Sequence, residues 1–269
     1  GAVGSPHILM LSGVGPADQL GSLGIPMMHD LPGVGQNLMN HLSAQVTFKV
    51  KDGLSLHGDF EAVHFGLHYT SEGSSEANDM LLRTTPMVDE RPERVPGLRT
   101  KFLNNDIPAE RVARLSVTLG LPDGSGYVRL ASADPTEQPT FNYCYLQDPN
   151  DRSRVREGIR KAVSFLESDA YKDVCDQRLH PTDDILGDDD ALDLYIRKTV
   201  GSARHVSGTC KMGPDSDPMA VVDQYCSVRG VKGLSVVDAS VKPRITRSGG
   251  SHATVLMIGE RAVDWIAPA

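Results

Sequence analysis

The sequence has few cysteines and no long apolar run. Its four cysteines stand far apart without a CxxC pair, which argues against a cysteine-ligated metal site and against a dense disulfide framework. No apolar stretch approaches the roughly 20 residues that a membrane-spanning helix needs, and no basic and apolar leader opens the chain. We therefore expect a cytoplasmic protein with reduced cysteines, no membrane span and no metal site.

Basic clusters are also missing. Acidic residues outnumber basic ones by 35 to 27, for a net charge of −8, so no basic stripe is present to neutralise the phosphates of a nucleic acid. With 269 residues and 39% hydrophobic content, the chain is long enough for one large domain or two smaller ones with a proper core. We expect a globular protein that does not bind nucleic acid.

The opening GAVGSPHILMLSGVGP predicts a short buried helix. Ser5 can cap it, Pro6 suits its first turn and Gly13 ends it. Because the chain starts in what reads as a packed element, we expect it to be a portion of a longer protein. Two glycine-rich turns follow, at 13–16 and 33–37, but neither completes the GxGxxG pattern of a nucleotide loop.

The middle of the chain predicts an antiparallel sheet. Alternating residues at 43–50 indicate a half-buried strand, and residues 53–106 hold one short strand among loops. Residues 112–119 and 127–130, joined by the turn PDGSG, are typical of a β-hairpin.

Two amphipathic helices and a final strand and helix are predicted next. The first helix starts near Asp151 or Ser153, and the second follows the acidic run 188–190, which suits a helix N-terminus. Their apolar positions recur at helical spacing: Val155, Ile159, Ala162, Val163 and Leu166 in the first, Leu192, Tyr195, Ile196 and Val200 in the second. Residues 233–238 indicate a short buried strand, and 253–266 a helix.

Two histidines are candidates for chemistry. His205 lies in ARHVSGTCKMGP and His252 in SGGSHATVLMIG, each among small residues that allow another molecule to approach. A lone histidine is more often structural than catalytic, and residues so far apart in sequence need not meet. His252 is the better placed of the two, since it directly precedes a helix N-terminus that favours a nearby anion.

Three separated motifs carry a resemblance. The segment from HVSGTCKMGP through GLSVVDASVKP to SHATVLMIGERAVDWI resembles the C-terminal signature of the glucose-methanol-choline oxidoreductases. GAVGSPHILMLSGVGP is similar to the second signature of that family, and LPGVGQNLMNH to the segment after it. LMNH stands where many members have LQDH.

The resemblance implies site residues and a cofactor. His205 matches the catalytic histidine, and His252 the second position, which is histidine or asparagine in different members. Asp238, Ala239, His252, Ala253 and Thr254 match residues that line the flavin of FAD. The family's N-terminal GxGxxG, which holds the ADP part of FAD, is absent from this sequence.

We therefore expect a mixed α/β (α+β) fold. Residues 1–42 and 201–269 would form the C-terminal part of a Rossmann-like FAD-binding domain, and 43–200 a substrate domain with an antiparallel sheet and helices. The expected activity is oxidation of a small-molecule alcohol, with hydride passing to FAD and the proton to His205. The expected partner is the missing N-terminal FAD-binding portion. A hydroxynitrile lyase of the same fold and a non-catalytic fragment are the alternatives.

Overall fold

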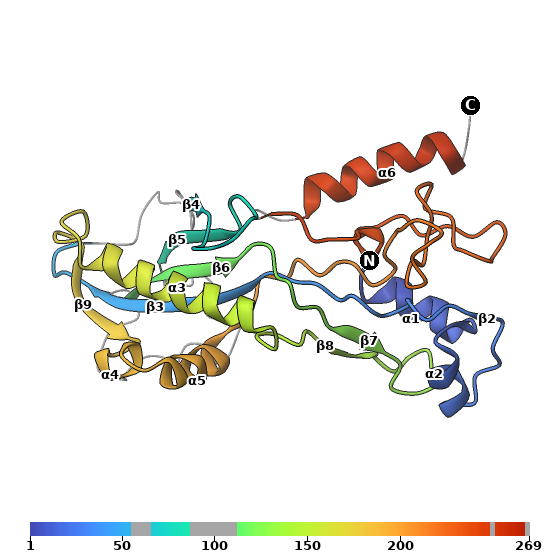
Figure 1. Ribbon diagram of the computed structural model, residues 1–269, viewed down its shortest axis with the longest axis horizontal. Helices are drawn as coiled ribbons and strands as arrows, with labels where there is room; N and C mark the ends of the chain where they lie inside the picture. Colours follow the sequence, from blue (N-terminus) through green and yellow to red (C-terminus); the bar gives the residue numbers. More distant parts are fainter. Residues whose placement is uncertain (55–65, 87–111, 248–250, 267–269) are drawn as a thin grey trace. The chain divides into compact units, whose positions relative to one another are not determined.

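The computed structural model describes residues 1–54, 66–86, 112–247 and 251–266 (Figure 1). The chain divides into two compact units. One comprises 1–41, 121–148 and 202–269, and the other 42–120 and 149–201. The sequence predicts a continuous middle domain of 43–200. The structure instead groups 121–148 with the N-terminal and C-terminal segments. The functional assignment of the domains stays a prediction.

The unit formed by 42–120 and 149–201 is built on a six-stranded sheet in the order β10-β3-β6-β5-β4, with β9 also paired to β3. The strands are β3 (Leu42–Val50), β4 (Gly66–Tyr69), β5 (Met80–Pro86), β6 (Val112–Leu119), β9 (Cys175–His180) and β10 (Gly201–Ser202). β3 pairs antiparallel with β6 and β9, and β5 pairs antiparallel with β4 and β6. The expected antiparallel sheet is confirmed.

The predicted strand at 43–50 is confirmed as β3, and its apolar residues are buried, but the polar face is more buried than the alternation predicts. Ser43 and Thr47 are buried together with the apolar residues that alternate with them. β3 lies inside the sheet rather than at its edge, and the Thr118 hydroxyl donates to the Ser43 hydroxyl at 3.4 Å. The buried Ser43 hydroxyl is accepted there because the neighbouring strand supplies this hydrogen bond.

The predicted hairpin is wrong. β6 pairs with the sequence-distant β3 and β5, with Leu119 opposite both Leu42 and Met80. The short β7 (Tyr127–Arg129) instead pairs with β8 (Thr140–Asn142). The turn PDGSG therefore leads out of one unit into the other, because the apolar partners that bury β6 come from distant strands.

The region 53–106 was predicted to hold one strand. Its described residues contain two, β4 and β5, while 55–65 and 87–106 lie outside the described residues. β5 carries the apolar run Met80-Leu81-Leu82, which is too short to show a period, and the strand ends at Pro86. Its partners in the sheet, rather than its own pattern, make it a strand.

Helix α3 (Pro149–Leu166) packs on β3, β5 and β6, and α5 (Asp189–Thr199) packs on β3. The short α4 (Asp183–Leu186) precedes α5. All five predicted apolar residues of α3 are buried. The predicted cap is wrong, since α3 begins at Pro149 and Asp151 lies inside the helix, where it pairs with Arg154. The α5 cap is confirmed, because the Asp188 carboxylate accepts from the Ala191 N–H.

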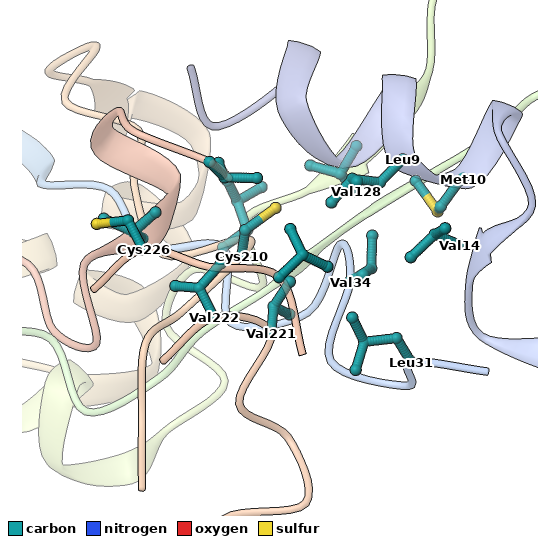
Figure 2. Close-up of a cluster of buried hydrophobic side chains, with 14 of the residues drawn as sticks. Leu9, Met10, Val14, Leu31, Val34, Val128, Cys210, Val221, Val222 and Cys226 are labelled. Carbon is teal, nitrogen blue, oxygen red and sulfur yellow. The ribbon is translucent and has the colours of Figure 1, made fainter. Parts of the chain in front are cut away.

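The other unit has little regular structure and one apolar core. Its elements are α1 (Gly4–Leu11), β1 (Val14–Gly15), α2 (Ala17–Ser22), β2 (His29–Asp30), β7, β8, the 3-10 helix η3 (Ala239–Val241) and α6 (His252–Ile266). Figure 2 shows the core, where Met10 of α1 and Val34 meet Val128, Cys210 and Val221. Segments from three parts of the sequence therefore close on one another here.

Two local predictions in this unit are wrong. Ser5 does not cap α1, because the helix begins at Gly4 and the Ser5 hydroxyl donates to the Asp238 carboxylate at 2.5 Å. Residues 233–238 form no strand, only an isolated bridge between Ser235 and Ser227. Val236 is buried nonetheless, and its N–H donates to the Cys226 carbonyl. A hydrogen bond between loops therefore takes the place of strand pairing at this residue.

The predicted C-terminal helix is confirmed as α6. Ala262 is buried, while four apolar side chains remain 53–58% exposed: Leu256, Met257, Val263 and Ile266. Among the described residues, no helix is long and apolar enough to cross a membrane.

Candidate active site

The segment 31–41 holds the loop that carries His205. Met39 and Ser207 exchange two backbone hydrogen bonds, of 2.9 and 3.0 Å, and the Gly35 N–H donates to the Thr209 carbonyl at 2.8 Å. The glycine-rich turn at 33–37 is thus held against the 205–213 loop by its own backbone. Two of the motifs that carried the resemblance lie side by side.

A second stretch of the C-terminal signature lies against the same loop. Residues 208–212 run beside η3 through three backbone hydrogen bonds, from Gly208 to Ala239, Cys210 to Ser240 and Met212 to Val241, of 3.1, 2.8 and 2.8 Å. Gly208 has φ +92°, and a Cβ there would lie 2.4 Å from the Asn37 carbonyl oxygen. Only glycine allows this close approach of the two loops.

His205 contacts a second histidine. Its Nδ1 lies 2.9 Å from Nδ1 of His41, and the two rings meet edge to face with centroids 5.1 Å apart. The side chain of His205 is half-buried, whereas His41 is 1% exposed. The Nε2 of His41 lies 2.8 Å from the backbone carbonyl of Thr246. The buried ring therefore bridges the backbone and the candidate catalytic side chain.

Asn40 holds the backbone of His205. Its buried amide oxygen accepts from the His205 N–H at 2.8 Å. Its amide nitrogen donates to the Tyr145 hydroxyl at 2.7 Å and to the Ser202 hydroxyl at 2.6 Å. Burial raises the pKa of Tyr145 above its usual value, so the phenol stays protonated. The Asn40 side chain therefore links the backbone of His205 to Tyr145 and Ser202.

Sequence reasoning did not single out Asn40 and His41 as site residues. The signal was present in LMNH, which follows a glycine-rich turn and stands where the resembled family often has LQDH. Nothing in the sequence alone shows that this segment meets residue 205, which is 164 positions from His41.

Asp238, a predicted cofactor residue, caps η3. Its carboxylate accepts from the Ser240 N–H at 2.7 Å and from the Ser5 hydroxyl at 2.5 Å. Burial alone would raise the pKa of Asp238, but hydrogen bonds from Ser240 and Ser5 hold it below the usual value. The ionised group fixes the start of η3, and with it the position of Ala239.

His252, Ala253 and Thr254 form the first turn of α6. The side chains of His252 and Ala253 are exposed, and the Thr254 hydroxyl accepts from Nζ of the buried Lys242 at 2.5 Å. The amide N–H groups of a first helical turn have no partner within the helix and carry the positive end of its dipole. The expected convergence of His252 with His205 on one oxygen stays a prediction.

These residues fit the ring end of a flavin. An exposed helix N-terminus offers amide donors to an anionic ring edge, and Ala239 and Ala253 are small enough for close approach. The same residues do not fit the ADP end, which needs a strand, a GxGxxG turn and a helix. The sequence contains no such turn.

Comparison with known proteins shows the family. The model of the GMC oxidoreductases matches residues 122–259, and the chain belongs to this family. It is 33% identical over 279 aligned residues to the oxygen-dependent choline dehydrogenase of Photobacterium profundum, covering 99% of this chain and 48% of that protein. It is 32% identical to the glucose dehydrogenase [FAD, quinone] of Drosophila melanogaster, covering 97% of this chain and 45% of that protein.

Solved structures agree. The pyridoxine 4-oxidase of Mesorbium loti superposes with a TM-score of 0.84 at 25% identity, over 98% of this chain and 50% of that one. A formate oxidase also gives 0.84 at 25% identity, over 99% of this chain and 52% of that one. The mixed α/β fold with its antiparallel sheet is therefore confirmed. The chain spans about half the length of the relatives that it matches.

Proposed function

We propose that the full-length protein oxidises a CH–OH group of a small alcohol to a carbonyl, with FAD as the hydride acceptor and His205 as the base. The observation that carries this proposal is the contact of His205 with His41 and Asn40, where the segment 31–41 pairs with the C-terminal signature. FAD would supply the redox chemistry, taking the hydride from the alcohol carbon.

His205 would take the hydroxyl proton. An alcohol carbon that loses hydride becomes a carbonyl only if the hydroxyl proton leaves too, and a base that titrates near neutral pH serves this best. Hydrogen bonds on both the ring and the backbone N–H restrict how far His205 can turn. A base held in one orientation loses less entropy on reaching the transition state.

The first turn of α6 would receive the flavin ring. The amide groups of 252–254 would stabilise negative charge on the reduced ring, while the exposed His252 would hydrogen-bond the substrate oxygen. Ala239 would line the ring, and Asp238 would act indirectly by fixing η3. The ADP-binding part of the site would come from a portion of the protein outside these 269 residues.

Anaerobic reduction of the bound flavin tests the proposal. The full-length flavoprotein would be mixed without oxygen with a panel of primary and secondary alcohols and followed by its visible absorbance. Bleaching by at least one alcohol, with the matching carbonyl as product, is expected. Cleavage of a cyanohydrin without bleaching would identify a hydroxynitrile lyase instead, and a full-length protein that binds no flavin would indicate a non-catalytic role.

A further inference from the structure

We propose that His41 is a positioning residue that holds His205 in the tautomer with its proton on Nδ1, so that Nε2 of His205 carries the basic lone pair. The effect of this tautomer on catalysis rests on the proposed function. The tautomer itself is a property of this chain and can be measured separately.

The backbone of Thr246 fixes the first proton. Nε2 of His41 lies 2.8 Å from the Thr246 carbonyl oxygen, and a carbonyl oxygen can only accept a hydrogen bond. Nε2 of His41 must therefore carry a hydrogen and donate it. A backbone carbonyl has no proton to donate, so in this hydrogen bond His41 is always the donor and Thr246 the acceptor.

Burial fixes the second proton. His41 is 1% exposed, and burial disfavours the charged form of an imidazole. A neutral ring with its hydrogen on Nε2 has a bare Nδ1, which can only accept. Nδ1 of His205, 2.9 Å away, must then be the donor. The proton of His205 is thereby assigned to Nδ1, and its Nε2 is the nitrogen with the lone pair.

The assignment matters because the two tautomers do opposite things. With its proton on Nδ1, His205 presents a base at Nε2. With the proton on Nε2, the same nitrogen is a hydrogen-bond donor and cannot accept a proton from an alcohol. In serine proteases a carboxylate selects the histidine tautomer, and its loss lowers the rate by orders of magnitude. Here a neutral, backbone-anchored histidine would have that task.

Nitrogen NMR on this chain tests the assignment directly. Histidine would be labelled with ¹⁵N, and two-bond correlations from the ring carbon-bound protons would report which nitrogen carries hydrogen. Signals of residues 41 and 205 would be assigned from variants at each position. At neutral pH we expect hydrogen on Nδ1 of His205 and on Nε2 of His41. Hydrogen on Nε2 of His205, or on both nitrogens of His41, would overturn the proposal.

Two variants separate positioning from folding. His41→Phe keeps a ring but removes the acceptor, so His205 should shift towards the Nε2–H tautomer. His41→Asn keeps an oxygen close to the position of Nδ1, so the Nδ1–H tautomer of His205 should be retained. His68→Phe, at an exposed position on β4, is the matched control and should leave His205 unchanged. The same tautomer of His205 in all three variants would overturn the role of His41.

Kinetics on the full-length flavoprotein connect the tautomer to catalysis. For His41→Phe, the rate of anaerobic flavin reduction should fall by up to the roughly 10²–10⁴-fold that loss of a general base costs, with KM little changed and with rescue by His41→Asn. A slow His205→Ala enzyme beside a fast His41→Phe enzyme would overturn the positioning role. If the predicted tautomer is observed but neither variant is slowed, the tautomer assignment holds and the proposed function fails.

Discussion

At the scale of single residues, two side chains of the candidate site hold His205 in place. Asn40 binds the backbone of His205, and His41 binds its ring. Both belong to the segment that follows the glycine-rich turn at 33–37. The departure of LMNH from LQDH thus falls at Met39 and Asn40, and Asn40 binds the backbone of His205, which we propose as the base.

Asn40 gives a first prediction. Asn40→Ala removes the buried acceptor of the His205 N–H and the amide that donates to the Tyr145 and Ser202 hydroxyls, so it should lower the free energy of unfolding by about 1–3 kcal/mol. Asn40→Asp keeps the acceptor for the His205 N–H, and the two hydroxyls can turn to donate to it.

Urea unfolding of this chain would measure both variants. We expect Asn40→Asp to lose less stability than Asn40→Ala. Equal losses would show that the bond to His205 contributes nothing to the fold.

The sequence predicts individual site residues unevenly. His205, His252 and Ala239 could be named because the resemblance assigns roles to their positions, whereas it assigned none to Asn40 and His41 in LPGVGQNLMNH. The link between residues 41 and 205 depends on backbone pairing of Met39 with Ser207. Such pairing joins irregular loops, and no periodicity in the sequence encodes it.

At the scale of elements, helices were predicted better than strand pairing. α3, α5 and α6 carry apolar residues at helical spacing, and this pattern is local. The pairing of β6 with β3 and β5 is not local, so a turn signal at 122–126 suggested the wrong partner. The sequence predicted one strand in 53–106 where the described residues hold two, for the same reason: the partners of β5 in the sheet make it a strand.

The contact of α3 with the sheet depends on Gly158. A Cβ at this position would lie 2.4 Å from Val117 Cγ1 and 2.9 Å from the Tyr69 hydroxyl. Gly158→Ala should therefore destabilise the chain by about 1–3 kcal/mol through overpacking, although alanine favours a helix by about 1 kcal/mol. Gly259→Ala in α6, where nothing lies within 4 Å of the added atom, is the control and should be neutral or stabilising.

Thermal unfolding of the two variants would decide. A stable Gly158→Ala protein would mean that α3 lies farther from the sheet than the structure shows.

A buried charge network also ties α3 to the sheet unit. The Asp79 carboxylate accepts from Ser71 at 2.6 and 2.8 Å and pairs with Arg154 at 3.2 Å. Burial alone would raise the pKa of Asp79, but the bonds from Ser71 and Arg154 hold it below the usual value. A lowered pKa adds stability that is complete above the unfolded value of about 3.9 and is lost as the pH falls through the folded value.

Asp79→Asn should therefore cost about 1.5–3 kcal/mol at pH 7, the range for hydrogen bonds to a charged group. The difference from the unchanged protein should shrink as the pH falls below about 4. Urea unfolding at several pH values would show it, and a difference that grows in acid would contradict the lowered pKa.

At the scale of the whole molecule, motifs spread along the chain are enough to predict the family and the mixed α/β fold. They do not show how much of a full-length family member the chain represents. The chain covers 48% of its choline dehydrogenase relative, and four apolar side chains of α6 remain 53–58% exposed. On the proposed function, the ADP-binding part of the flavin site would lie outside these 269 residues.

The chain alone should accordingly bind FAD weakly or not at all, because the amide donors of a GxGxxG turn have no substitute in it. Adding the N-terminal portion that bears this turn should restore binding, seen as flavin absorbance that elutes with the protein. A stoichiometric yellow complex of the 269-residue chain alone would contradict this.

The central claim is that His205 is the base of an FAD-dependent alcohol oxidation, and one rate tests it most directly. In the full-length flavoprotein, His205→Ala should slow anaerobic flavin reduction by roughly 10²–10⁴-fold while the flavin content stays normal. His68→Ala, at an exposed position on β4, should leave the rate unchanged. A His205→Ala enzyme that reduces its flavin as fast as the unchanged protein would contradict the account.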